Sequence, residues 1–350
     1  MQRIARFSVL IGTAALLACN EPIADVVPAL PEVDQPETGP LPIAFVSDRD
    51  GFPHIFLSDE DGSLVLPLVR GEAPAWSPDG QQIAFHSWES DPPGVHVINA
   101  DGTQRKRLAD GQDPAWSSDG SIAFDGDGGI YVIDAEGRDA PRLVLGDASD
   151  LPRPDWYDPE YFAGGSIGLP AWSPDGERIA FVRFDWFSWD WGSAPSAYVM
   201  NADGSELRFL GGLCDIDPPG EGSLPCRTTD PFWSPTGALG VVTERWTHEG
   251  IEPAVAIIGD GGWDLRDILY IGRAGHSILS PHWSPSGSHI VFSSFPAAGD
   301  DSGRTRIFVL TLATGVVRQL IPSAPSETGV VYGDWAPAWG ADSGAGDWDY

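Results

Sequence analysis

Two stretches of the sequence place aromatic rings beside carboxylates. Residues 184–192 read FDWFSWDWG, and residues 155–162 read DWYDPEYF. Such a mixture suits sugar stacking combined with hydrogen bonds to hydroxyl groups, and it is equally typical of a protein-binding hot spot. The alternative is that the rings pack on one another and order two long loops. The candidate binding residues are Trp156, Tyr157, Trp186, Trp189, Trp191, Trp246 and His248.

Residue types that serve in catalysis are present, but their spacing favours no catalytic site. Residues 164–168 read GGSIG and match the G-x-S-x-G pattern of a hydrolase nucleophile. No strand-to-helix pattern surrounds them, so we interpret them as a flexible glycine-rich loop. The seven histidines are scattered, with no two at metal-ligand spacing. We therefore predict no catalytic residue, no metal site and no cofactor.

The first residues are typical of an export signal. Arg3 and Arg6 precede an apolar run over residues 7–18, which is too short to span a bilayer. The run ends in Leu-Leu-Ala-Cys, which resembles a bacterial lipobox, after which Cys19 would carry the lipid. Residues 19–40 are rich in proline and acidic residues and predict an extended tether. We expect a lipoprotein of the bacterial cell envelope, on its periplasmic or cell-surface side.

The two remaining cysteines bound a loop. Cys214 and Cys226 enclose the sequence DIDPPGEGSLP, which contains no histidine and makes a poor metal site. In an exported protein a disulfide is the expected state of such a pair. The chain-entropy model gives a bond of this loop length about 3 kcal/mol.

One heptapeptide recurs along the chain. PAWSPDG occurs at 74–80 and 170–176, and variants of it occur at 114–120, 231–237, 281–287 and from 337 onward. The repeated tryptophans are Trp76, Trp116, Trp172, Trp233, Trp283 and Trp339. Each heptapeptide begins with a short strand that ends at its tryptophan. Two apolar runs and a last short run follow most copies, so each unit has four strands. Four strands at a minimum period near 40 residues are typical of a β-propeller blade.

The chemistry of the repeat is structural. Ser-Pro-Asp-Gly is a tight turn, because Pro presets φ, Asp caps the backbone and Gly accepts the strained φ that ends the turn. We expect the side chain of the tryptophan before this turn to lie in the core and to fill the space between neighbouring blades.

At these residues the sequence resembles the WD40-like repeat of TolB-type propellers, which also occurs in prolyl oligopeptidases. The resemblance covers about residues 41–340 and implies six blades. It also implies that residues 337–339 supply the missing inner strand of the first blade. The 40 residues before the propeller are too few for the α/β domain that TolB carries, and the chain lacks the length of a hydrolase domain. We expect residues 341–350 to form a disordered tail.

Loop lengths and charge indicate the kind of partner. Turns from first to second strand and from third to fourth are short, so the surplus length falls on the opposite face, for example at 184–196 and 244–253. Short loops suffice to close a fold, so long ones predict a binding face. The formal net charge of −31, with Lys106 as the single lysine, disfavours nucleic acid.

The sequence therefore predicts a monomeric, all-β, six-bladed propeller that binds an envelope protein or glycan without catalysis. A polysaccharide lyase or hydrolase with its site at the channel mouth is the alternative. Three or more His, Asp or Glu side chains gathered in the channel would favour the enzyme.

Overall fold

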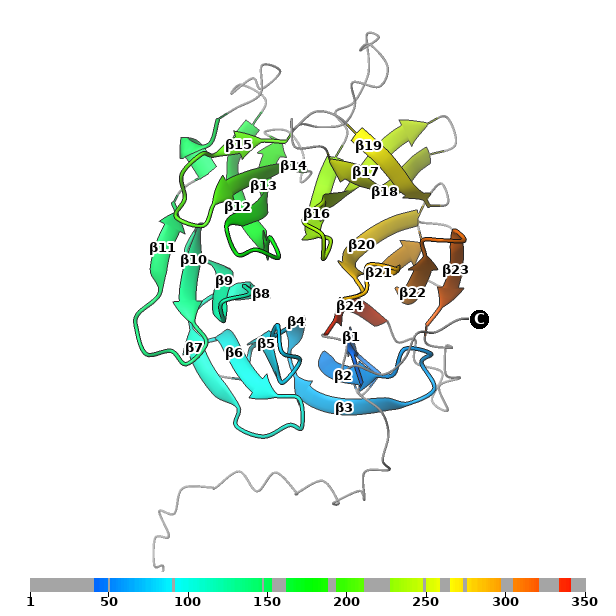
Figure 1. Ribbon diagram of the computed structural model, residues 1–350. Coiled ribbons are helices and arrows are strands. Elements are labelled where there is room, and N and C mark those ends of the chain that lie inside the picture. The colour runs from blue at the N-terminus through cyan, green and yellow to red at the C-terminus, as the bar shows by residue number, and fades with distance from the viewer. Residues whose placement is uncertain are drawn as a thin grey trace, which may run out of the picture. The chain divides into compact units, whose positions relative to one another are not determined.

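The computed structural model arranges the strands in six four-stranded antiparallel sheets around a common centre (Figure 1). The structure describes residues 41–49, 51–89, 92–146, 148–152, 162–187, 193–210, 227–247, 250–258, 265–272, 276–296, 305–320 and 334–340. Each sheet is one blade, and the innermost strand of each blade faces the central channel. The prediction of an all-β, six-bladed propeller is confirmed.

The strands of the six blades are as follows. Blade 1 consists of β24 (Asp334–Trp339), β1 (Ile43–Ser47), β2 (His54–Ser58) and β3 (Val65–Arg70), and blade 2 of β4 (Glu72–Trp76), β5 (Gln82–Ser87), β6 (Gly94–Asn99) and β7 (Lys106–Ala109). Blade 3 consists of β8 (Gln112–Trp116), β9 (Ser121–Gly126), β10 (Gly129–Asp134) and β11 (Arg142–Leu145), followed by the short 3₁₀ helix η1 (Ala148–Asp150). Blade 4 consists of β12 (Phe162–Trp172), β13 (Arg178–Phe187), β14 (Ser193–Asn201) and β15 (Arg208–Phe209). Blade 5 consists of β16 (Arg227–Trp233), β17 (Leu239–Thr247), β18 (Gly250–Ile258) and β19 (Leu265–Ile271), and blade 6 of β20 (His276–Trp283), β21 (His289–Pro296), β22 (Arg306–Thr311) and β23 (Val316–Gln319).

The ring closes through the last strand of the chain. β24 pairs antiparallel with β1, so that Ile43 lies opposite Trp339 and Ala44 opposite Ala338. Blade 1 thereby takes its inner strand from the C-terminal part of the propeller and its other three strands from the N-terminal part (Figure 1). This pairing joins the two ends of the propeller by backbone hydrogen bonds.

The repeated Ser-Pro-Asp-Gly segments form the turns that the sequence predicts. In the first copy the Gly80 N–H donates to the Ser77 carbonyl at 2.9 Å, and the Ser77 hydroxyl donates to Asp79 Oδ1 at 2.7 Å. Gly80 has a φ of 66°, in the left-handed region that favours glycine. The same glycine-to-serine backbone bond recurs at Gly120, Gly176, Gly237 and Gly287.

The hydrophobic core is divided into six clusters, one at each junction between blades. Each cluster contains or contacts one repeated tryptophan: Trp339 between blades 6 and 1, Trp76 between 1 and 2, Trp116 between 2 and 3, Trp172 between 3 and 4, Trp233 between 4 and 5, and Trp283 between 5 and 6. The Trp233 indole N–H also donates to the Ala171 carbonyl of the preceding blade at 3.1 Å. The tryptophans therefore tie neighbouring blades together.

The second face departs from expectation in its secondary structure. The interpretation of 164–168 as a flexible loop is wrong, because these residues lie in β12 and pair with β13. The expectation that 184–196 and 244–253 are loops is also wrong in part. β13 runs to Phe187 and β14 starts at Ser193, while β17 runs to Thr247 and β18 starts at Gly250. Strand pairing satisfies backbone groups that a loop would leave to water, and aromatic residues favour it. Within the described residues, part of the surplus length is therefore built into taller hairpins.

The pattern of contacts divides the chain into two units. Residues 39–350 form the unit that contains the propeller, and residues 1–38, the other unit, lie outside the described residues. Within the described part of the chain, no helix has the length and apolar character needed to cross a membrane.

Candidate functional site

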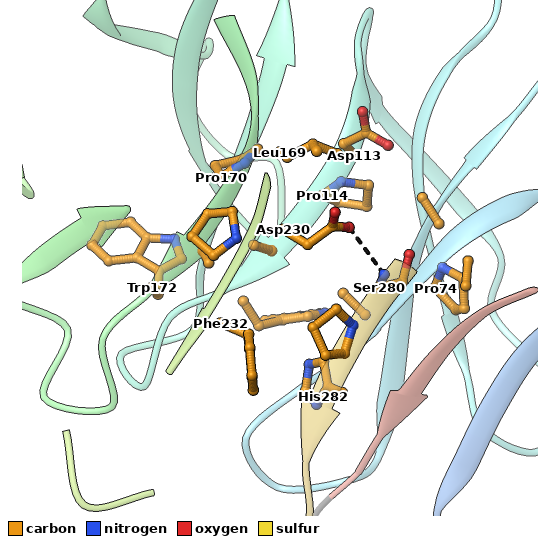
Figure 2. A pocket seen from close by; sticks show the side chains of 18 of the residues that line it. Pro74, Asp113, Pro114, Leu169, Pro170, Trp172, Asp230, Phe232, Ser280 and His282 are labelled. Atoms are coloured by element: carbon orange, nitrogen blue, oxygen red, sulfur yellow. Dashed lines mark hydrogen bonds between the residues drawn. The ribbon is translucent and has the colours of Figure 1, made fainter. Parts of the chain in front are cut away.

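The inner strands surround a central cavity of about 430 Å³ (Figure 2). All six strands contribute the proline before the repeated tryptophan and the residue directly before that proline. In five of the strands, all except β24, the lining continues to the tryptophan, and β4 adds Glu72. The residue directly before this proline has a left-handed φ between 48° and 53° in every blade: Ala73, Asp113, Leu169, Asp230, Ser280 and Ala336. The ladder with the second strand is interrupted there by a β-bulge. These bulges give the cavity a ring of variable side chains on a repeated frame.

Three carboxylates line this cavity, on three different blades. Glu72 comes from blade 2, Asp113 from blade 3 and Asp230 from blade 5. Asp230 reaches toward blade 6, where the Ser280 N–H donates to its Oδ1 at 3.0 Å (Figure 2). Each carboxylate keeps some accessible surface, but that surface faces a protein-walled channel and not open solvent.

Confinement and mutual repulsion disfavour the charged forms of these acids. Burial, and next the charge of Asp230, raise the pKa of Asp113 to about 6. Burial raises the pKa of Asp230, and burial together with the charge of Asp113 raises the pKa of Glu72. His282 lines the same cavity. Its accessible surface faces the channel, and desolvation there lowers the pKa of the imidazole.

A fourth carboxylate lies behind the ring at the junction of blades 3 and 4. Burial, and next the charge of Asp113, raise the pKa of Asp125 to about 7, although Gln112 Nε2 donates to its Oδ2 at 3.2 Å. Its other oxygen is buried and has no hydrogen-bond partner among the described residues. Gly168 makes room for this side chain, since a Cβ there would lie 2.7 Å from Asp125 Oδ2.

The arrangement has two chemical capacities. A cationic group entering the cavity would offset the repulsion among these carboxylates. Asp113 and Asp125 titrate near neutral pH, so the pair could also supply one acid and one base. Among the described residues, no group of three or more His, Cys, Asp or Glu side chains could hold a metal ion.

Exposed apolar side chains gather on one face. Of the seven large hydrophobic residues that are exposed in the described chain, five lie toward the face of the taller hairpins: Phe52, Trp88, Trp186, Leu279 and Phe295. The other two, Leu143 and Val316, lie on the outermost strands β11 and β23. We call the first group the apolar rim. The opposite face, formed by the Ser-Pro-Asp-Gly turns and the third-to-fourth-strand turns, has no such group among the described residues.

On blades 1 and 2 the rim is held in place by polar and aromatic neighbours. The ring of His86 meets that of Trp88 edge-on at 4.6 Å. The guanidinium of Arg70 lies 5.2 Å from the ring centre of Phe52 and also pairs with Glu89 at 3.5 Å. Trp88 nevertheless remains 50% exposed.

The candidate residues from the sequence can be placed only in part. Trp186 lies in β13 and is 49% exposed, as a binding residue requires. Trp246 lies in β17, and its side chain is not described. The remaining candidates lie outside the described residues: Trp156, Tyr157, Trp189, Trp191, His248, and the cysteines Cys19, Cys214 and Cys226.

Sequence reasoning missed the carboxylates of the channel. A signal was present, because an alignment of the six repeats shows one variable column directly before the conserved proline, occupied by Ala, Asp, Leu, Asp, Ser and Ala. Variation inside an otherwise repeated inner strand marks positions that the architecture does not determine.

The comparisons with known proteins agree with this fold. A 67-residue stretch is 38% identical to the Tol-Pal system protein TolB of Shigella flexneri, and it covers 19% of this chain and 14% of that protein. The crystal structure of TolB from Acinetobacter baumannii has a TM-score of 0.58 at 19% identity, covering 86% of this chain and 66% of that chain. A putative TolB from Agrobacterium tumefaciens has a TM-score of 0.51 at 19% identity, covering 81% of this chain and 90% of that chain. No model of a known protein family matches the sequence.

These findings define the class of the protein. The repeat, the six blades and the likeness to TolB confirm the resemblance to the TolB-type β-propeller family. At identities of 19% the structural likeness concerns the fold, and a fold of this kind hosts many functions.

Proposed function

We propose that this protein is a membrane-anchored, extracytoplasmic propeller that binds a protein or glycan of the bacterial envelope without chemically changing it. The observation that carries the proposal is the apolar rim, which lies on the face of the taller hairpins. Its five side chains come from four of the six blades, and their concentration on this face favours it over the opposite face as an interaction surface. The similarity to the Tol-Pal system protein TolB supports a protein partner and a place in the envelope.

Recovery of bound envelope components tests the binding face. Tagged protein with Trp88→Ala and Trp186→Ala should recover at least tenfold less of a specific, cross-linked component than the wild type. Val316→Ala is the matched control, because Val316 is 58% exposed but lies on an outermost strand. Equal recovery by all three proteins would remove the rim from the binding site.

The anchor makes a separate prediction. Cys19→Ala should move the protein from the membrane fraction to the soluble fraction, or leave the precursor unprocessed, because the lipid would have no thiol to bind. Fractionation followed by intact-mass measurement of the mature N-terminus checks this. A wild-type mature protein that begins at another residue, or that carries no lipid, would contradict it.

Catalysis is the second candidate, and two observations favour it. Glu72, Asp113, Asp230 and His282 line the channel, which meets the criterion for an enzyme that three or more His, Asp or Glu side chains gather there. The charge of Asp113 contributes to the raised pKa of Asp125, and the pKa values of Asp113 and Asp125, about 6 and about 7, suit proton transfer near neutral pH. A hydrolase or lyase of this design would release reducing ends from an envelope polysaccharide, and Asp125→Asn would abolish that release. A panel of oligosaccharides that the wild type leaves intact would remove this candidate.

A further inference from the structure

The inner strand of blade 4 differs from the other five. β12 has 11 residues, whereas the inner strands of the other blades have between 5 and 8. It is the edge of its sheet, and its strand partner within the described chain is β13. The edge of a strand presents backbone N–H and C=O groups that can pair with another extended chain.

The additional length of β12 is rich in glycine. Gly164, Gly165 and Gly168 pair in regular register with β13, and Gly164, Gly165 and Ser166 are half-buried residues that keep some accessible surface. Packing explains part of this composition, since a Cβ at Gly165 would lie 2.8 Å from the Phe184 carbonyl oxygen. A strand edge with so few side chains is open to close approach by a second backbone.

Carboxyl groups lie on both sides of this edge. Asp113 and Asp125 belong to blade 3 and Asp230 belongs to blade 5, and their strands β8, β9 and β16 contact β12. No Lys or Arg is among the described residues that line the cavity. The exposed indole of Trp186 projects from β13, in the same hairpin.

We propose that β12 pairs with an extended segment of a partner protein, and that a Lys or Arg side chain of this segment enters the channel between the carboxylates of blades 3 and 5. The inference rests on the proposed binding function and names its partner chemistry. A polypeptide fits better than a glycan because only a polypeptide offers N–H and C=O groups at the spacing of a strand edge. Charge complementarity selects the basic side chain, and Trp186 would cover an apolar neighbour in the segment.

Peptide selection followed by backbone methylation tests this proposal. A random nonapeptide library is selected against the full chain in 0.15 M salt, and each enriched peptide is then resynthesised with one N-methyl group at each position in turn. Strand pairing predicts that N-methylation weakens binding at least tenfold at alternate positions, because alternate amides face the protein strand. Loss at no position, or a contiguous run of losses, would overturn the pairing.

Variants separate specific recognition from general attraction to an acidic protein. Enriched peptides should contain Lys or Arg, and they should bind Asp113→Asn/Asp125→Asn at least tenfold more weakly than the wild type. Asp139→Asn/Glu136→Gln likewise replaces two carboxyl groups by amides, at exposed positions on blade 3, and should bind like the wild type. Equal weakening by both pairs, or selection of peptides without basic residues, would overturn the inference.

The proposed function can survive the failure of this inference. If Trp186→Ala weakens the selected peptides while the channel substitutions and N-methylation do not, the rim binds partners in another way. If no substitution on this face matters, both proposals fail.

Discussion

The two faces of the propeller arise from the same repeat and yet differ in what determines them. On one face, Ser-Pro-Asp-Gly turns recur with nearly the same hydrogen bonds, as at Gly80 and Gly120. On the other, hairpin height varies from blade to blade and the described surface carries exposed rings such as Trp88 and Trp186. The sequence repeats where each blade needs a tight turn between its first two strands. It varies on the opposite face, where the fold does not require a particular hairpin height or side chain. The comparison separates residues that stabilise the ring from residues available for binding.

Tryptophan substitutions should give the largest difference in the free energy of unfolding between a residue that stabilises the ring and a residue available for binding. Trp339 is 6% exposed and lies in the cluster between blades 6 and 1, so Trp339→Ala should lower the free energy of unfolding by about 3–5 kcal/mol. Trp186→Ala removes an exposed ring and should change it by about 0.5 kcal/mol or less. Urea denaturation of both variants measures the difference. Equal destabilisation would mean that Trp186 belongs to the core.

Carboxylate substitutions should differ in sign between the channel and the turn face. Because the folded-state pKa of Asp125, about 7, exceeds the ordinary value of 3.8, the folded protein holds a proton that the unfolded chain releases. The contribution of this group to stability is therefore complete below pH 3.8 and declines as the pH rises through 7. At pH 8, Asp125→Asn should raise the free energy of unfolding by roughly 1–3 kcal/mol, and the gain should shrink toward pH 4.

Asp203, on a turn of the opposite face, is the matched control. Hydrogen bonds from the Ser205 side chain and backbone lower its pKa, so its charge stabilises the folded state above pH 3.8. Asp203→Asn should slightly lower the melting temperature across the range from pH 4 to pH 8, because this stabilisation is lost only as the pH falls below 3.8 and through the lowered folded-state pKa. Melting curves between pH 4 and 8 compare the two variants, and the same sign for both at pH 8 would contradict the account of the channel.

A glycine substitution isolates the backbone requirement of the turn face. Gly120 has a φ of 87° and open space around its Cα, so Gly120→Ala should cost about 1 kcal/mol through backbone strain alone. Gly146 also has open space but no left-handed φ, so Gly146→Ala should cost nothing. Chemical denaturation checks the pair, and equal effects would show that the left-handed φ is not the cause.

Much of the fold could be predicted from the sequence because each repeat contains the residues that form the strands and turns of its own blade. The tryptophan, the turn and the apolar runs recur locally, so the number of blades could be predicted, and the resemblance to TolB-type propellers added the closure of the ring by residues 337–339. The channel carboxylates could not, since the pKa of Asp113 depends on Asp230, which lies on another blade and far along the chain. The boundary between loop and strand at 184–187 was also missed, because it depends on pairing with residues 193–196 that composition does not reveal.

Hydroxyl-radical footprinting of the protein in native envelopes tests the central claim most directly, because it needs no knowledge of the partner. Oxidation of Trp88, Trp186 and Phe295 should fall at least threefold in envelopes relative to the purified protein, since a bound partner would cover the apolar rim. Oxidation of Leu143 and Val316, which are 51% and 58% exposed on the outermost strands, should stay the same. Equal oxidation of all five residues in both preparations would contradict the assignment of this face as the binding surface.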